Sequence, residues 1–261
     1  MTPEENVTNE PAIRRARLRV AYHGASFHGF AANDDVATVE GVLEKAIATI
    51  TQRNIEISTA GRTDAGVHAL QNFFHFDTDT VITQKQVYNL NAILPNTIVI
   101  KAIYEVPPTA HCRFDATTRS YIYKLHTQKD PFLEGRSWYY PFPIDFNLLN
   151  QATQTLLNFT HYESFSKKNT SVNTFECSVS KALWQVEGTN LYFHIDSNRF
   201  LRGMIRGLVG TLLQVGRGQI TVEEWMDIVA SNNEQRVDFS TPAYGLYLSA
   251  IQYPDFLKKI D

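Results

Sequence analysis

The chain has 261 residues, of which 43% are hydrophobic and 20% charged, and its formal net charge is -3. This composition is typical of a globular protein with one large domain or two smaller ones. Two cysteines, with no Cys-x-x-Cys or His-Glu-x-x-His motif, argue against a disulfide framework and a zinc site, and we expect no metal or cofactor. Residues 1–11 are too polar for a signal peptide and no apolar run could span a membrane, so we expect a cytoplasmic protein.

Nucleic-acid-binding proteins are usually basic, and this chain as a whole is not. Its basic residues nevertheless gather in three clusters, whereas acidic residues gather near the N-terminus and in residues 223–238. The clusters are Arg14, Arg15, Arg17 and Arg19; Arg113, Arg119 and Lys124; and Arg199, Arg202, Arg206 and Arg217. This distribution is compatible with a basic groove on an acidic protein, provided that the clusters converge in the fold.

The first part of the chain predicts a mixture of strands and helices. Apolar and basic residues alternate over residues 17–22, which predicts a half-buried strand. An apolar stripe over residues 39–50 predicts a helix capped by Thr38. Residues 73–76 and 98–104 favour strands, and the Thr83–Gln86 capping box opens a helix between them. Pro107-Pro108 is the best candidate boundary between two halves.

The second part predicts a similar mixture. Residues 119–125 favour a strand, residues 148–159 an amphipathic helix, and residues 184–195 a hairpin around Gly188. A second strong helix is predicted over residues 200–214, and Thr221 with Glu224 opens a third. Strands and helices without regular alternation predict an α+β fold.

The helix predicted over residues 200–214 carries arginines and glycines on neighbouring faces. Arg199, Arg202 and Arg206 project together, beside Gly203, Gly207 and Gly210. Glycine inside a helix costs about 1 kcal/mol relative to alanine, so we expect a helix, a strand or a ligand to approach this backbone closely. The arginine face is either solvated or functional, with one arginine reaching a carboxylate and the others contacting phosphates.

Residues 61–69 carry the strongest functional signal. They place Arg62 and Asp64 in a glycine-containing turn after the strand-like residues 55–57. Backbone geometry positions such a carboxylate, and the nearby guanidinium favours its charged form, which suits a nucleophile better than a proton donor. The alternative is structural: Gly61 and Gly66 serve a tight turn, and Asp64 caps the following segment.

The string Gly-Arg-Thr-Asp-Ala-Gly-Val-His-Ala at residues 61–69 resembles the signature of the tRNA pseudouridine synthase A family. Residues 200–210 are similar to the family's Phe-Leu-x-x-Met-Val-Arg-x-x-Val-Gly segment, and residues 22–30 to its opening segment. Further similar segments follow in the expected order, at residues 91–95, 113–116, 119–121, 161–166 and 242–247. The chain departs from the family at His23, usually aspartate, at Phe30, usually tryptophan, and at residues 31–33, usually Gln-x-Gln.

The resemblance implies an α+β fold of two similar domains. Their antiparallel sheets join into an extended central sheet, with helices on one side and the active-site cleft between the domains. We therefore expect a disordered acidic tail at residues 1–12, an N-terminal domain at 13–107 with the aspartate loop, and a C-terminal domain at 108–261 with the tyrosine and the arginine helix.

The resemblance also implies an isomerase, a tRNA pseudouridine synthase that converts uridine to pseudouridine at positions 38–40 of the anticodon stem-loop. Such an enzyme acts as a homodimer and needs no cofactor. Asp64 is then the nucleophile, attacking either the sugar or the uracil ring, and Arg62 helps to extrude the target nucleotide. Tyr121 packs against the base, and Arg206 forms a salt bridge with Asp64. Candidate substrate-binding residues also include Arg199 and Arg202, whereas His68 and His75 are interpreted as structural.

Two alternatives stay open. A non-catalytic RNA-binding module of the same fold would not need Asp64, Arg62, Tyr121 and Arg206 together. A carboxylate-dependent hydrolase such as a glycosidase needs paired acids, and no second carboxylate stands out, since Asp77 and Asp79 look like strand-end residues.

Overall fold

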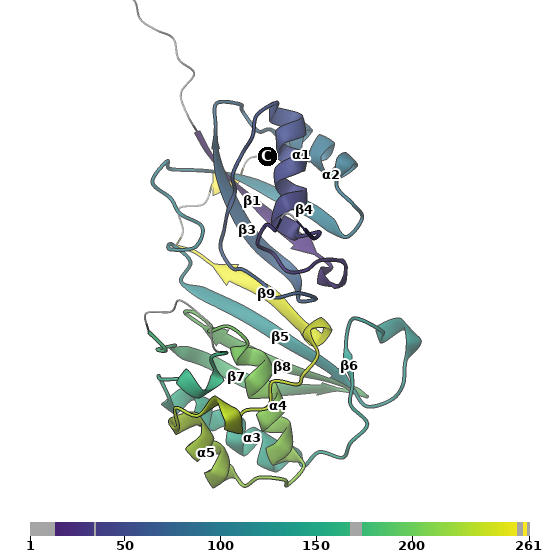
Figure 1. The fold of residues 1–261 in the computed structure, drawn as a ribbon, viewed down its shortest axis with the longest axis vertical. Helices are drawn as coiled ribbons and strands as arrows, with labels where there is room; N and C mark the ends of the chain where they lie inside the picture. Colours follow the sequence, from purple (N-terminus) through teal and green to yellow (C-terminus); the bar gives the residue numbers. More distant parts are fainter. Residues whose placement is uncertain (1–13, 34, 168–173, 255–257, 260–261) are drawn as a thin grey trace, which may run out of the picture.

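The computed structural model describes residues 14–33, 35–167, 174–254 and 258–259, so the predicted tail of residues 1–12 lies outside the described residues. These residues form one sheet with helices packed on it (Figure 1). The strands are β1 (Arg14–Tyr22), β2 (Ser58–Thr59), β3 (His68–Thr78), β4 (Ile98–Val106), β5 (Thr118–His126), β6 (Trp138–Tyr139), β7 (Val179–Glu187), β8 (Asn190–Ser197), β9 (Leu246–Gln252) and β10 (Lys258–Lys259). The α-helices are α1 (Val39–Thr51), α2 (Gln84–Ile93), α3 (Phe146–Thr155), α4 (Met204–Gly216) and α5 (Val222–Ala230).

Strands β3 and β9 join the two halves of this sheet. The strand order is β10-β4-β1-β3-β9-β5-β8-β7, with β2 on β3 and β6 on β5. The long pairs within each half, such as β1–β3 and β5–β8, are antiparallel. Across the junction β3 runs parallel to β9, with His68 opposite Tyr247 and Ala69 opposite Leu248. The α+β fold with an extended central sheet is therefore confirmed.

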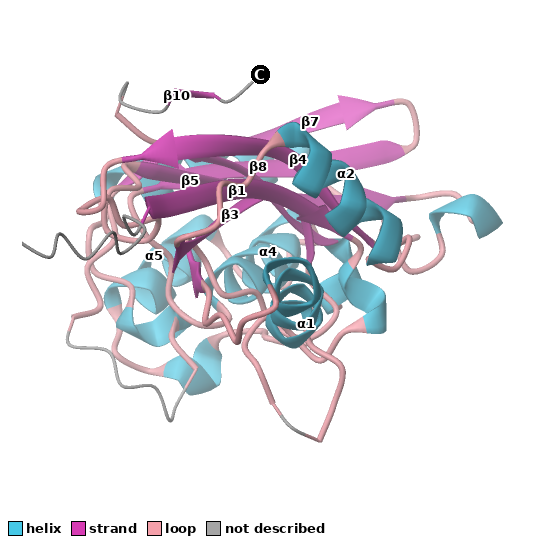
Figure 2. Cartoon of the chain, turned by 90° about the horizontal axis from the view of Figure 1, so that it is seen from above, coloured by secondary structure: helices cyan, strands magenta, loops and turns pink. Residues whose placement is uncertain are grey.

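Helices α1, α4 and α5 lie on one side of the sheet (Figure 2). The buried apolar side chains form one cluster in each half of the molecule. Leu43 and Ile47 of α1 belong to the first, and Leu208 of α4 and Trp225 of α5 belong to the second. Each helix thus buries one apolar stripe, as its periodicity predicts. No described helix combines the length and the hydropathy that a membrane crossing requires.

The chain beyond residue 108 contributes to both halves. Cys112, Leu248 and Ile251 pack in the cluster that contains α1, and β10 pairs with β4. The domain boundary near Pro107 stays a prediction. The late strands nevertheless tie the two halves together, because β9 pairs with β3 on one side and with β5 on the other.

The predicted helix starts rest on local caps. Thr38 Oγ1 accepts a hydrogen bond from the Gly41 amide at 3.3 Å, and α1 begins at Val39. Capping boxes form between Thr83 and Gln86 at α2 and between Thr221 and Glu224 at α5. These three predictions are confirmed, since each cap involves residues only three positions apart.

The helix predicted from residue 200 begins later, at Met204. Gly203 has a φ of 77°, the left-handed conformation that glycine adopts without strain, so the helix cannot continue through it. Arg199 and Arg202 therefore lie before α4, and only Arg206 belongs to it. The prediction of a common arginine face is wrong for this reason.

The glycines of α4 have a packing role. A methyl group on Gly207 would lie 2.8 Å from side-chain atoms of Val237 and Phe239, and one on Gly210 would overlap the carbonyl of Asp238. The expected close approach is therefore made by the segment of residues 237–239, which crosses the helix.

Gly210→Ala is expected to lower the free energy of unfolding by about 1–3 kcal/mol, because this overlap outweighs the helix propensity of alanine. Urea unfolding of both proteins measures the difference. Gln214→Ala in the same helix is the control, with an expected change within about 0.5 kcal/mol. Stabilisation by Gly210→Ala would contradict the packing of residues 237–239 against this helix.

Candidate active site

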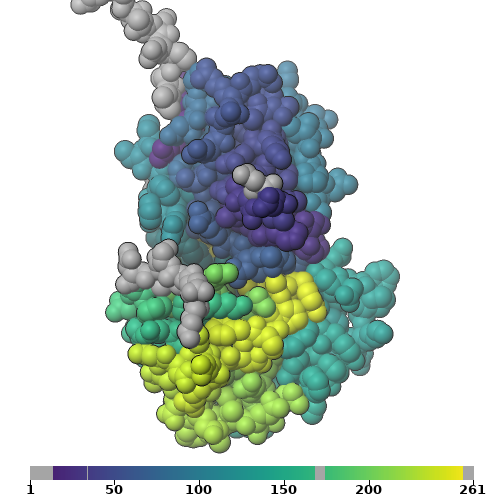
Figure 3. Space-filling view, in the orientation of Figure 1, coloured from purple at the N-terminus to yellow at the C-terminus, as the bar shows by residue number. Residues whose placement is uncertain are grey.

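Asp64 lies in the loop between β2 and β3, beside the junction of the two halves. Its side chain is half-buried and that of Arg62 is exposed. The Val67 amide closes the turn by donating to the Asp64 carbonyl at 3.1 Å. On the surface, the C-terminal part of the chain, drawn in yellow, adjoins the N-terminal part, drawn in blue (Figure 3). The carboxylate is thus carried by a short, tied turn.

The segment of residues 24–30 packs directly on this loop. The Phe30 amide donates to the Thr63 carbonyl at 3.0 Å, and the Gly66 amide donates to the Phe27 carbonyl at 3.3 Å. A side chain at Gly24 would overlap the Val67 carbonyl. Two backbones therefore run in contact here, and glycine is required where they approach most closely.

Buried polar side chains of β1 and β3 hold the loop of Asp64 in place. Asn72, which is fully buried, donates to the Gly61 carbonyl at 2.9 Å and to the Tyr22 hydroxyl at 3.3 Å. The Tyr22 hydroxyl also lies 2.8 Å from Thr63 Oγ1. Burial raises the pKa of Tyr22 to about 12, so the phenol stays neutral at physiological pH. No local sequence pattern predicts this network, because it joins three separate segments.

His68 connects the loop to the C-terminal half. Its Nδ1 accepts a hydrogen bond from the Gly24 amide at 3.0 Å, so Nε2 carries the proton and donates to the Tyr244 carbonyl, also at 3.0 Å. The ring stacks on Tyr247 with 4.5 Å between the ring centroids. These contacts use both ring nitrogens in a structural role.

Tyr121 lies in β5, where Leu248 of β9 and Ile195 of β8 are its partners. Its ring packs edge-on against Phe200 with 5.2 Å between the centroids. Burial raises the pKa of Tyr121, and the neighbouring Tyr22 and Asp64 raise it further, so this group is a neutral phenol. The fold therefore brings Tyr121 into the electrostatic neighbourhood of Asp64, although the two residues lie in different halves of the sequence.

Arg206 does not form the expected salt bridge. Among the described residues, the ion pairs within 4.0 Å do not include one between Arg206 and Asp64. Arg206 Nε instead donates to the Thr241 carbonyl at 2.7 Å, and Thr241 Oγ1 donates back to the Arg206 carbonyl at 2.9 Å. The prediction of a direct ion pair is wrong because backbone carbonyls of residues 239–241 take up this guanidinium.

Among the described residues, no hydrogen bond or ion pair joins the side chains of Arg62, Arg199 or Arg202 to Asp64. Arg202 is exposed, and its carbonyl accepts from the Lys167 amide at 3.0 Å. Arg199 is half-buried and lies near Cys177. Burial raises the pKa of the Cys177 thiol to about 11, and the charge of Arg199 partly offsets this rise. Their roles in substrate binding stay predictions, as does that of Arg62.

Arg119 is a further structural arginine whose role the sequence analysis missed. It donates to the Asn198 carbonyl at 2.7 Å, to the Arg113 carbonyl at 2.6 Å and to the Ala60 carbonyl at 3.2 Å. Ala60 stands at the start of the Asp64 loop, so Arg119 ties this loop to the end of β8. The motif Arg119-Ser120-Tyr121 contains this arginine, but its tyrosine alone carries the expected functional role.

Removal of the Asn72 side chain tests the support of the loop. Asn72→Ala removes the 2.9 Å hydrogen bond to the half-buried Gly61 carbonyl, which keeps only a 3.3 Å bond from Thr59 Oγ1, and it also removes the bond to the Tyr22 hydroxyl. We therefore expect a loss of about 1–3 kcal/mol in unfolding free energy. Hydrogen exchange should also quicken at residues 61–67. Asn91→Ala is the matched control, because Asn91 clamps Ile100 with two backbone hydrogen bonds in the same half. Equal exchange at residues 61–67 in both variants would contradict this role of Asn72.

The buried His68 predicts a pH dependence of folding. Burial lowers the pKa of His68 from 6.5 to about 4. The unfolded chain therefore binds more protons than the folded protein between these values, and the free energy of unfolding falls as the pH is lowered through this window. Urea unfolding at a series of pH values should show a weaker dependence for His68→Gln and an unchanged one for His161→Gln, at an exposed position. An unchanged slope in His68→Gln would refute the assignment.

The sequence is similar to proteins of known family over nearly its whole length. The family model described as tRNA pseudouridine synthase matches residues 19–115 and 157–254. Two relatives named tRNA pseudouridine synthase A come from Parabacteroides distasonis and Bacteroides thetaiotaomicron. The first is 37% identical over 95% of this chain and 100% of its own length, and the second is 38% identical over 93% and 92%.

A more distant relative of the same name, from Staphylococcus aureus, is 34% identical over 91% of both chains. The segments matched by the family model contain the Asp64 loop, residues 24–30 that pack on this loop, and helix α4. With a family model that covers most of the chain and relatives of full length, this chain belongs to the tRNA pseudouridine synthase family.

Proposed function

We propose that this protein isomerises uridine to pseudouridine in tRNA, with Asp64 as the nucleophile. The observation that carries the proposal is a half-buried carboxylate on a loop that Asn72 and residues 24–30 hold by hydrogen bonds. The charge of this carboxylate also raises the pKa of Tyr121. The relatives named tRNA pseudouridine synthase A support the same reaction.

The reaction breaks the bond between C1′ of the ribose and N1 of uracil, and forms a bond from C1′ to C5. The hydrogen on C5 leaves as a proton and N1 gains one, so atoms and electrons balance without a redox partner. Asp64 attacks either C1′ or the uracil ring, and the resulting covalent intermediate splits one difficult step into two easier ones. The tied loop supports this role because it limits the motion of the carboxylate during both steps.

The remaining residues have supporting roles in this proposal. Arg62, exposed next to Asp64, helps to extrude the target nucleotide and fills its place, at a flipping cost of a few kcal/mol. Tyr121 packs against the extruded base with a neutral phenol. Arg206 is a positioning residue that acts through residues 239–241, next to the Tyr123 hydroxyl, which donates to the Pro242 carbonyl at 2.8 Å. Arg199 and Arg202 contact phosphates.

The finer expectations belong to the proposal as well. The substrate is the anticodon stem-loop at positions 38–40, the enzyme acts as a homodimer, and it works in the cytoplasm without a cofactor. Mapping pseudouridine in tRNA from a strain that lacks the gene tests the positions, and sedimentation equilibrium tests the dimer.

Asp64→Asn is expected to reduce pseudouridine formation by at least about 10³-fold, because the amide is not a nucleophile. Release of tritium from tRNA that carries [5-³H]uridine measures the reaction, and nucleoside analysis of the digested RNA identifies the product. Asp79→Asn, which removes the carboxylate that pairs with Arg53, is the control and should keep its activity. Absence of pseudouridine with the unchanged protein on every tRNA would overturn the proposal, and released uracil would indicate a hydrolase.

A further inference from the structure

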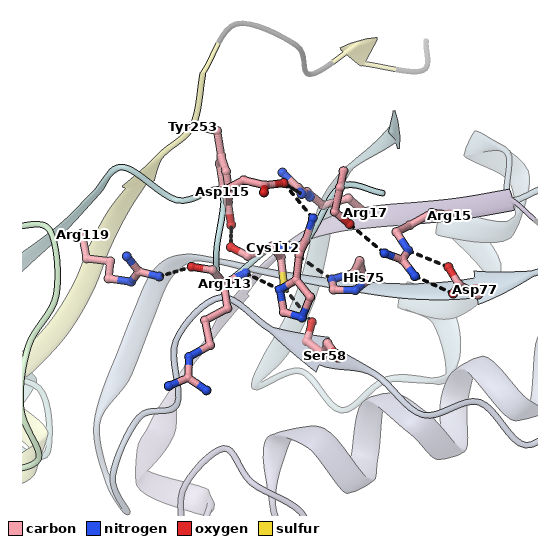
Figure 4. Close-up of polar contacts among 12 residues, drawn as sticks. Arg15, Arg17, Ser58, His75, Asp77, Cys112, Arg113, Asp115, Arg119 and Tyr253 are labelled. Carbon is pink, nitrogen blue, oxygen red and sulfur yellow. Dashed lines mark hydrogen bonds and ion pairs between the residues drawn. The ribbon is translucent and has the colours of Figure 1, made fainter. Parts of the chain in front are cut away.

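A group of metal-binding side chains lies outside the candidate active site. His75 of β3 lies against His111 and Cys112, and one nitrogen of each imidazole and the Cys112 sulfur lie within 4.8 Å of one another. His75 and Cys112 are buried and His111 is half-buried. Figure 4 shows His75 and Cys112 surrounded by the polar groups of β1, β2 and residues 113–119. No other such group of three occurs in the described part of the chain.

The hydrogen bonds define where each ligand holds its lone pair. The Cys112 amide donates to His75 Nδ1 at 3.3 Å, and the Arg113 amide donates to His111 Nδ1 at 3.2 Å. Both rings therefore hold a lone pair on Nδ1 and the proton on Nε2. Each of these two bonds is long, so coordination through Nδ1 sacrifices little hydrogen bonding. Cys112 Sγ donates to the Ser58 carbonyl at 2.9 Å.

Only a small movement would bring the three atoms into contact with one metal ion. With bonds of about 2.0 Å to nitrogen and about 2.3 Å to sulfur, ligand atoms around an ion lie roughly 3.5 Å apart. The present spread of up to 4.8 Å has to close by about 1 Å. The half-buried His111 side chain has more room to move toward an ion than the buried His75 and Cys112 have.

The neighbouring charges decide which kind of ion fits. Arg15 donates to both carboxylate oxygens of Asp77 at 2.6 Å, and Arg17 lies 3.3 Å from Asp115. Each of these pairs is neutral, because one guanidinium is matched by one carboxylate. A monovalent ion that replaces the thiol proton leaves the charge of the site unchanged, whereas a divalent ion adds one positive charge beside the two arginines.

We propose that His75, His111 and Cys112 form a binding site for one soft d¹⁰ metal ion, with Cu(I) preferred over Zn(II). Thiolate and imidazole are ligands that such ions favour, and three ligands suffice for Cu(I). On binding, the sulfur–hydrogen bond breaks, a sulfur–metal bond forms and the proton passes to water, without any change of oxidation state. The proposal is independent of the proposed isomerisation, in which no metal takes part.

Titration of the full chain with Cu(I) under anaerobic, reducing conditions, in competition with a chromogenic Cu(I) chelator, measures the affinity. A parallel titration uses Zn(II) with a zinc chelator, and native mass spectrometry counts the ions per chain. We expect one Cu(I) per chain, and a loss of affinity of at least about 100-fold in Cys112→Ser. Cys177→Ser, which changes the other buried cysteine, is the matched control and should bind as the unchanged protein does.

His111→Asn is a second test at a half-buried position, with His161→Asn as its exposed control, and thermal unfolding verifies that each variant folds. His111→Asn should lose affinity and His161→Asn should keep it. Tighter binding of Zn(II) through the same three residues would overturn the preference for Cu(I) while supporting the site. Absence of binding, or binding that survives both Cys112→Ser and His111→Asn, would overturn the site itself.

Discussion

The short parallel pairing of His68 and Ala69 with Tyr247 and Leu248 is the contact on which the candidate active site depends. It is the point at which the two halves of the sheet meet, and Asp64 stands only four residues before it. A shift of one residue would turn His68 to the opposite face of the sheet and break its bonds to Gly24 and Tyr244. The position of the carboxylate is thus set by both halves together.

Rigid support of the loop comes from buried polar groups rather than from a helix. Asn72, Tyr22 and His68 are all neutral. Asn72 and His68 bond to backbone groups of Gly61 and Gly24, and the Tyr22 hydroxyl bonds to the Thr63 side chain in the loop. Neutral groups suit this purpose, because a buried charge would need a partner and would change the electrostatic potential at the Asp64 carboxylate. The buried groups that support the loop of Asp64 are therefore polar but uncharged, and the nearby charges are those of Arg62 and Arg119.

The parts of the fold that depend on local signals could be predicted from the sequence. The caps at Thr38, Thr83 and Thr221 act over three residues, and the amphipathic stripes of α1 and α5 carry their own periodicity. The start of α4 could not be predicted. Gly203 fits the glycine stripe of a helix, whereas its positive φ depends on the packing around it.

Contacts between segments that lie far apart in the sequence could not be predicted from local patterns. The motif at residues 61–69 led to Asp64, but nothing in the sequence shows that Asn72 supports Gly61 or that carbonyls of residues 239–241 take up Arg206. The contact of His75 with His111 and Cys112 likewise joins segments that lie far apart in the sequence. These residues follow no metal-ligand spacing, and the hydrogen bonds of Cys112 to His75 and to Ser58 bring them together.

The distribution of arginines shows why net charge is a poor guide to RNA binding in this protein. Arg15, Arg119 and Arg206 donate hydrogen bonds to carbonyl groups of the chain, and Arg15 and Arg17 pair with carboxylates. An arginine engaged in this way stiffens a loop, and it contacts a phosphate only with the donors that it has left. The arginine clusters of the sequence thus overstate the number of phosphate contacts. Arg113 and Arg202 are exposed members of these clusters, and Arg62 is exposed outside them. Their contribution to RNA binding depends on where the loops hold them rather than on the charge of the whole chain.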